Sequence, residues 1–139
     1  MGVSVVFAAL VIAVSDGDTL TALSDQREQI KVRIAEIDAP ERRQPFGAAS
    51  KRSLSDLCFK VRAEIRQTAR DRYGRTVARV TCRGQDASAH QVRSGMAWVF
   101  ERYASDRSLF QLQDDAKAAG RGLWSERTPV PPWEWRKAR

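Results

Sequence analysis

Alternation of apolar and polar positions predicts a β-sheet in the first third of the chain. Residues 9–14 form an apolar run, and residues 19–23 and 30–37 alternate between apolar and polar side chains. Pro40 ends the third of these segments, because proline cannot donate a hydrogen bond to a strand ladder. Short polar stretches separate the three segments, so we expect three strands in an antiparallel meander.

The rest of the chain mixes helical and strand periodicity. We expect a helix over 45–59, strands over 60–70 and 76–82, a helix that begins within 87–100 and breaks at Gly95, and a helix over 105–124. Five strands and about three helices, one of them inserted after the third strand, predict an α+β, mainly β, fold. The order is that of a five-stranded OB-type Greek-key barrel.

We divide the chain into three segments on these patterns. Residues 1–8 are interpreted as an N-terminal extension or the remnant of a leader, residues 9–126 as the OB-fold domain, and residues 127–139 as a Pro/Trp-rich basic tail that wraps the surface. The apolar N-terminus is too short to cross a bilayer as a helix and lacks the charged n-region of a signal peptide. We therefore expect no membrane span, and whether a natural leader was removed stays open.

Charge and cysteine content narrow the classes of function. The chain has 139 residues, enough for one domain, and 24 Lys+Arg against 17 Asp+Glu give a net charge of +7. Such a surface favours nucleic acid first, and an acidic membrane or polysaccharide second. Cys58 and Cys82 lack metal-ligand spacing, and the single histidine, His90, makes a zinc site improbable. The cysteines form one disulfide or two buried free thiols, and a bridge would indicate an oxidising compartment.

The stretch VSDGDTL, residues 14–20, has two interpretations. Asp-Gly after an apolar run is a strong signal for a hairpin turn, and on this stretch alone the turn is favoured. The alternative is a cation site. If the first strand runs up, the second down and the third up, the turn that holds Asp18 and the exit of the third strand at Asp38 share one rim of the sheet.

Residues at this rim have the chemistry of phosphodiester hydrolysis. Two carboxylates completed by water suit a hard cation such as Ca²⁺ or Mg²⁺. Arg33 and Arg75 offer planar guanidinium groups that match phosphate oxygens, and Glu41 is a carboxylate that can take a proton from water. Each residue taken singly also has a purely structural explanation, as a turn, a cap or a surface charge. Asp18, Asp38 and these three residues together, all at expected strand ends, favour the chemistry.

Three motifs carry a resemblance to a known family: SDGDTL (15–20), VRIAEIDAPE (32–41) and DRYGR (71–75). The chain resembles the thermonuclease, or staphylococcal-nuclease-like, family from about Ala9 to Glu126. This resemblance implies that Asp18 and Asp38 are carboxylate ligands of Ca²⁺ and that the backbone carbonyl of Ala39 is a third. It also implies that Glu41 is the general base.

The resemblance assigns the substrate contacts as well. Arg33 and Arg75 match the two arginines that bind the scissile phosphate, and Arg72 and Tyr73 match positions that touch a neighbouring phosphate. Arg72 stands where many members have lysine. Trp98 lies where an aromatic residue binds a nucleotide.

The function implied is that of a Ca²⁺-dependent endonuclease. It would hydrolyse DNA and RNA, single strands preferred, with little sequence specificity and would leave 3′-phosphate ends. We expect a monomer that is secreted or periplasmic, with a cytoplasmic location left open, and we predict a Cys58–Cys82 bridge. The alternative is a catalytically inactive OB-fold module that binds nucleic acid or protein. Such modules typically lose the carboxylates or arginines, and here all five are present.

Overall fold

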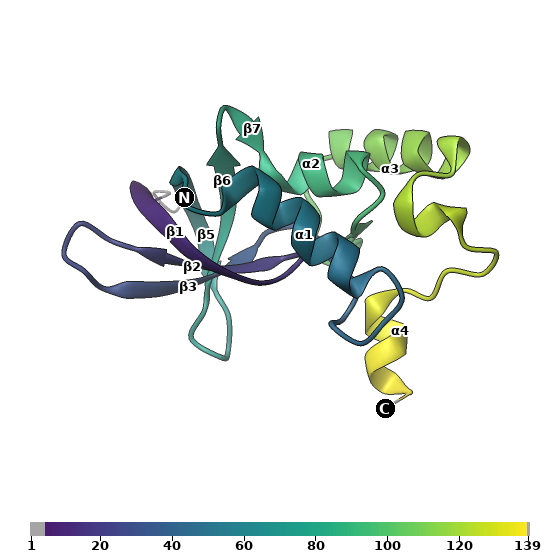
Figure 1. The fold of residues 1–139 in the computed structure, drawn as a ribbon, viewed down its shortest axis with the longest axis horizontal. Helices are drawn as coiled ribbons and strands as arrows, with labels where there is room; N and C mark the ends of the chain where they lie inside the picture. The colour runs from purple at the N-terminus through teal and green to yellow at the C-terminus, as the bar shows by residue number, and fades with distance from the viewer. Residues whose placement is uncertain (1–4, 139) are drawn as a thin grey trace.

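A computed structural model describes residues 5–138. The strands form a barrel on one side of the molecule, and the helices lie on the other side (Figure 1). The elements in chain order are β1 (Val5–Asp16), β2 (Thr19–Leu23), β3 (Gln29–Ile34), β4 (Ile37–Asp38), α1 (Gly47–Cys58), β5 (Arg62–Arg70), β6 (Thr76–Cys82), β7 (Gln85–Asp86), α2 (Ala87–Arg93), β8 (Trp98–Val99), α3 (Ser108–Ala119), the 3₁₀ helix η1 (Gly122–Ser125) and α4 (Pro132–Lys137).

Five strands close into the barrel. They lie in the order β3-β2-β1-β5-β6, and a parallel pairing between β3 and β6 joins the two edges. The long strand β1 pairs with β5 along its first half and with β2 along its second half, with register shifts in the second half that bend it. The remaining neighbours are antiparallel. The predicted five-stranded OB-type barrel is therefore confirmed.

Several elements differ from the sequence-based expectation. The helix expected over 105–124 is α3, which ends at Ala119 because Gly120 takes a left-handed conformation, and the separate 3₁₀ helix η1 follows it. Strand β1 begins at Val5, because Val5 to Leu10 pair with β5, so the expected boundary at residue 9 lies inside a strand. The third strand ends at Ile34 instead of residue 37, because Glu36 takes a left-handed conformation, with φ of 70°, and turns the chain into β4. The tail contains a fourth helix, α4, that the proline-rich composition did not suggest. Residues 1–4 of the expected extension lie outside the described residues.

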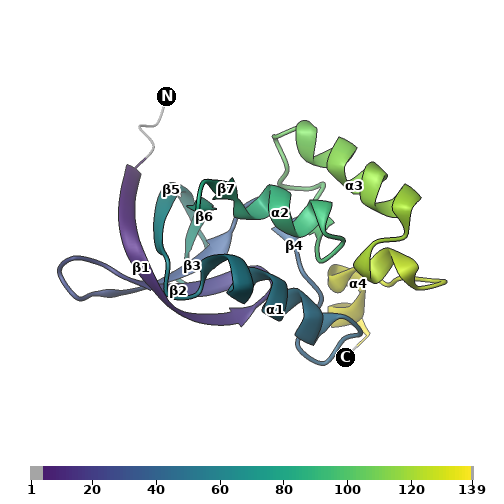
Figure 2. The same cartoon turned by 45° about the horizontal axis from the view of Figure 1, so that its top comes forward.

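The apolar stripes of β-strands and helices meet in a single core. Helix α1 lies across one end of the barrel, α2 lies beside α1, and α3 packs on the far side of α2 (Figure 2). Both the barrel and the helices contribute fully buried side chains to this core, among them Leu20, Val32, Ile34, Ile37, Leu54, Ile65, Val80, Val92 and Leu109. No helix between residues 5 and 138 has the length and apolar character needed to cross a membrane.

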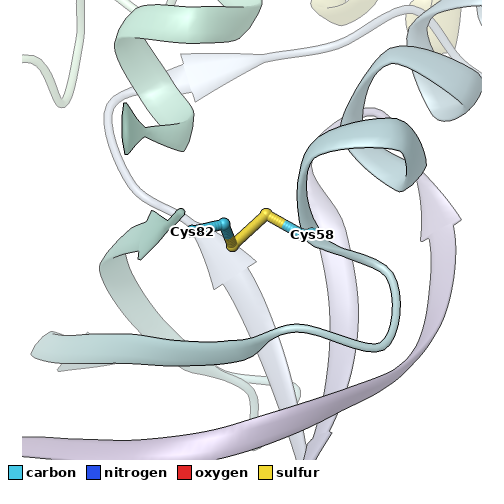
Figure 3. Close-up of a disulfide and its surroundings, with 2 residues drawn as sticks. All are labelled: Cys58 and Cys82. Carbon is cyan, nitrogen blue, oxygen red and sulfur yellow. A yellow bond between two sulfur atoms is a disulfide. The ribbon is translucent and has the colours of Figure 1, made fainter. Parts of the chain in front are cut away.

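A disulfide links the end of α1 to the end of β6 (Figure 3). It joins Cys58 to Cys82, whose Cα atoms lie 5.4 Å apart, and both side chains are fully buried. The bridge closes a segment that contains all of β5 and nearly all of β6. It therefore ties helix α1, which packs against the first turn of the barrel, to the opposite part of the sheet.

Candidate active site

The turn between β1 and β2 holds Asp18 beneath the surface. Asp18 is 6% exposed, and its backbone N–H donates to Asp16 Oδ1 at 3.0 Å. Its carboxylate accepts from the Thr19 hydroxyl at 2.9 Å and from the Ala39 N–H at 2.8 Å. Gly17 lets the turn approach α1, because a Cβ there would lie 1.7 Å from Ser50 Oγ. The stretch is thus a turn, and it also directs one of its two aspartates toward β4.

The strand β4 holds the second carboxylate opposite the first. Asp38 is 1% exposed and follows Ile37 in a two-residue strand that pairs with β8. One nitrogen of Arg33, Nη2, lies 3.4 Å from Asp18 Oδ2 and 3.5 Å from Asp38 Oδ1. Arg33 comes from β3, and its Nη1 donates to the carbonyl of Ile34 at 2.7 Å, which fixes the guanidinium. A single arginine therefore bridges the two buried carboxylates.

Electrostatics at this rim favour a further positive charge. Burial raises the pKa of Asp38, and the charge of Asp18 raises it further, against the hydrogen bond from Arg136 and the charge of Arg33. Burial also acts to raise the pKa of Asp18, but the charge of Arg33 and hydrogen bonds outweigh it, so this pKa is lowered. Burial and the charge of Asp18 raise the pKa of Asp16 to about 7. Crowded carboxylates of this kind are relieved by a bound cation.

The loop after β4 places Glu41 beside the pair. The Glu41 N–H donates to Gln44 Oε1 at 3.0 Å, and its carbonyl accepts from the Gln44 N–H at 2.9 Å. A Cβ at Gly47 would lie 2.1 Å from the Glu41 carbonyl oxygen, so the loop packs tightly on the start of α1. The Glu41 carboxylate is partly exposed, with a side-chain exposure of 37%. It is therefore open to solvent while it lies in the loop that directly follows Asp38.

Arg136 completes this cluster and was missed by the sequence analysis. It comes from α4, and its Nη2 lies 2.7 Å from Asp38 Oδ2. Its Nη1 contacts Asp38 Oδ1 at 3.2 Å and Glu41 Oε1 at 2.5 Å. The basic composition of the tail was the only signal, because nearly a hundred residues separate Arg136 from its partners.

Arg72, Tyr73 and Arg75 form a separate group at the tip of the β5–β6 hairpin. Asp71 organises the turn: its Oδ1 accepts from the N–H groups of Tyr73 and Arg75, and its Oδ2 accepts from Arg75 Nε at 2.7 Å. Arg72 Nη2 donates to the Tyr73 hydroxyl at 2.9 Å, and Tyr73 is 69% exposed. Residue 76, which follows this turn, pairs with residue 32 of β3.

The structure thus brings some predicted site residues into contact and leaves others apart. Arg33, Asp18, Asp38 and Ala39 form one cluster, and Arg136 links Glu41 to it through Asp38. Within residues 5–138, no ion pair joins the arginines of the hairpin tip to the carboxylates of that cluster. The pairing of β6 with β3 nevertheless places the hairpin tip on the strand next to the one that carries Arg33.

Trp98 lies in an aromatic cluster behind the carboxylates. Its ring centroid is 4.5 Å from that of Trp124 and 5.6 Å from that of Trp133, both in edge geometry. Lys117 Nζ lies 5.9 Å from its centroid. Trp98 is partly buried, and it pairs with Asp38 through β4 and β8. These contacts support α4 and β4 directly, whereas the stacking of a nucleotide on Trp98 stays a prediction.

The oxygen donors are limited in number. Among the residues that the structure describes, no group of three or more His, Cys, Asp or Glu side chains is arranged to hold a metal ion. Asp18 and Asp38 offer carboxylate oxygens, which hard cations prefer, and the Ala39 carbonyl remains a predicted ligand. A cleft of about 650 Å³ opens beside them, lined by Ser15, Asp16, Glu41, Arg42, Arg43, Trp135 and Arg136.

Comparison with known proteins identifies the family of the chain. The family model described as staphylococcal nuclease homologue matches residues 31–126. The chain belongs to this family. An uncharacterized endonuclease of Haemophilus influenzae is 44% identical over 127 residues, which are 91% of this chain and 71% of that protein. The micrococcal nuclease of Shigella flexneri is 35% identical over 143 residues, covering 95% of this chain and 82% of its own length.

Membership of the staphylococcal nuclease homologue family supports a nuclease function for the chain. The matched stretch contains Arg33, Asp38, Glu41 and the hairpin tip with Arg75. Asp18 lies upstream of it, in the turn that the structure folds back onto the matched stretch. Arg136 lies downstream, in the tail.

Proposed function

We propose that this chain is a Ca²⁺-dependent endonuclease that hydrolyses DNA and RNA with little sequence specificity and leaves 3′-phosphate ends. The observation that carries the proposal is the pair of buried carboxylates, Asp18 and Asp38, that share one guanidinium nitrogen of Arg33. A buried pair of like charges beside a positively charged cleft is costly for a purely structural purpose. It is useful where a divalent cation and a phosphate must be held together.

The residues present fit a divalent cation. The donor set is oxygen-only, the two carboxylates approach one point, and Asp38 and Asp18 disfavour each other's charge. A hard cation held by two carboxylates takes the rest of its ligands from water or substrate. When bound here, Ca²⁺ would supply positive charge that polarises the phosphodiester and stabilises charge in the transition state.

The chain's own residues supply the rest of the reaction. Arg33 and Arg75 bind the phosphate oxygens, since a guanidinium forms paired hydrogen bonds with them. Glu41 takes the proton of the attacking water, and the partial exposure of its carboxylate supports this role. Arg72 and Tyr73 bind a neighbouring phosphate from the hairpin tip. The 5′-oxygen leaves, and the phosphate stays on the 3′ side.

The net charge and the disulfide support proposals for the substrate and for the cellular location. A net charge of +7 supports binding of either nucleic acid through its backbone, with affinity that falls as salt rises. We propose a preference for single strands, whose flexible backbone can enter the cleft more freely than that of a duplex. The Cys58–Cys82 disulfide supports an exported, secreted or periplasmic protein. We propose that it acts as a monomer.

The test is cleavage of an end-labelled single-stranded DNA with Ca²⁺ and with a chelator. We expect cleavage only with Ca²⁺, and a loss of turnover of at least ~10² for both Glu41→Gln and Arg75→Ala, because each removes one group that acts in the transition state. If the wild-type protein binds the DNA but cuts it in neither condition, the endonuclease proposal is wrong, and the result favours the catalytically inactive binding module. Near wild-type rates in both variants would show that other residues carry the reaction.

A further inference from the structure

The tail of the chain places the positively charged side chain of Arg136 against the carboxylates of Asp38 and Glu41. Arg136 makes a two-pronged contact with Asp38, at 2.7 Å and 3.2 Å, and a further contact with Glu41. Three of the five guanidinium N–H groups are used in these contacts. Arg136 therefore occupies oxygens of Asp38 that the proposed function requires for the cation, and an oxygen of Glu41 that it requires for the proton of the attacking water.

The approach of Arg136 is fixed by two contacts that precede it along the tail. The ring of Trp133 stacks on that of Phe100, with the planes 1° apart and the centroids separated by 5.4 Å. Upstream, Gln44 Nε2 donates to the Val130 carbonyl at 2.6 Å. Gln44 also holds the Glu41 loop, so one side chain ties the tail to the loop whose carboxylate Arg136 contacts. The contact of Arg136 is thus part of a docked segment.

Arg136 and a divalent cation need the same oxygens of Asp38. Both carboxylate oxygens of Asp38 accept from Arg136, at 3.2 Å and 2.7 Å, so an ion that binds Asp38 must displace at least one of these contacts. Arg33 Nη2 already lies 3.5 Å from Asp38 Oδ1, so Arg136 and an ion together would crowd three positively charged groups around one carboxylate.

We propose that Arg136 is a tethered competitor of the divalent cation, so that ion binding at Asp18 and Asp38 releases residues 130–138 from the site. This inference rests on the proposed function, because it concerns the same cation. The docked tail closes one side of the cleft that Trp135 and Arg136 line, and its release opens that cleft to substrate. The tail then makes the enzyme responsive to Ca²⁺ concentration.

Calorimetric titration of the intact protein with Ca²⁺, without nucleic acid, tests the competition. We expect Arg136→Gln to bind Ca²⁺ at least about 10-fold more tightly than wild type, since a partly buried ion pair no longer has to be broken. Arg136→Lys keeps the charge but loses the two-pronged geometry, so its Ca²⁺ affinity should lie between those of wild type and Arg136→Gln. The control is Lys137→Gln in the same helix, whose side chain is 75% exposed and 3.9 Å from Glu134, and it stays within 2-fold of wild type.

A second measurement needs no variant. Hydrogen exchange of the backbone amides of residues 133–138 in wild type should become faster at saturating Ca²⁺. Exchange that stays unchanged or slows would overturn the release. Equal or weaker Ca²⁺ binding by Arg136→Gln would overturn the competition while the proposed function stands. The absence of Ca²⁺ binding in every variant would overturn both proposals together.

Discussion

Gly17 offers a sharp test of how the first turn is positioned. In Gly17→Ala, the new Cβ would lie 1.7 Å from Ser50 Oγ, 2.8 Å from Ser50 Cβ and 2.9 Å from Ala39 Cβ. Such distances cannot be tolerated, so either the turn or α1 must move. Overpacking of a well-packed site costs about 1–3 kcal/mol. Ser50 Oγ also donates to the Met96 carbonyl at 2.6 Å, and losing that bond adds about 1 kcal/mol.

We therefore expect Gly17→Ala to lower the free energy of unfolding by about 2–4 kcal/mol, measured by urea denaturation. Ser50→Gly by itself also destabilises, because it loses the bond to Met96 and places glycine inside a helix. In the double variant, however, the clash of Gly17→Ala with Ser50 is gone. Its cost should be smaller than the sum of the two single costs by at least about 1 kcal/mol. Additive costs would refute the close approach of the turn to α1.

Two further predictions concern the stability of the fold and its disulfide. The Ser108 hydroxyl and the Arg79 guanidinium hold the pKa of Asp106 below its usual 3.8, so its ionised form stabilises the fold above that pH. Asp106→Asn should therefore cost about 0.5–1 kcal/mol at pH 7, and the difference in unfolding free energy should vanish as pH falls through the lowered pKa; a difference independent of pH would contradict this. Alkylation of the unreduced, denatured protein followed by mass spectrometry should leave Cys58 and Cys82 unmodified, and two alkylated cysteines would exclude the bridge.

Most of the barrel could be predicted from local patterns. Strands such as β2 and β6 follow from alternation, because each has one face in the core. The end of β3 could not be predicted in this way, because Ala35 and Ile37 continue an apolar pattern across the turn. Glu36 stabilises that turn only through distant partners: the backbone N–H groups of Ser105 and Asp106, and Arg79.

The candidate site was predictable where the motifs lie close to strand ends. The up-and-down order of the first three strands places Asp18 and Asp38 at one rim, and the structure brings them together through Arg33 and the Ala39 N–H. Arg136 was not predictable, because its contact with Asp38 depends on the path of the whole tail and on the stacking of Trp133. Long-range ion pairs of this kind leave no periodic signal in a sequence.

The measurement that tests the central claim most directly is a Ca²⁺ titration of DNA cleavage by Asp18→Asn and Asp16→Asn. Asp16→Asn keeps the side-chain oxygen that accepts from the Asp18 N–H, whereas Asp18→Asn keeps one of the two oxygens that accept from Thr19 and Ala39. Neither residue forms an ion pair with Arg136 among the described residues. We predict that Asp18→Asn needs at least about 10-fold more Ca²⁺ for half-maximal cleavage, whereas Asp16→Asn stays close to wild type. Equal Ca²⁺ requirements in Asp18→Asn and wild type, or cleavage by wild type in the presence of a chelator, would contradict the account.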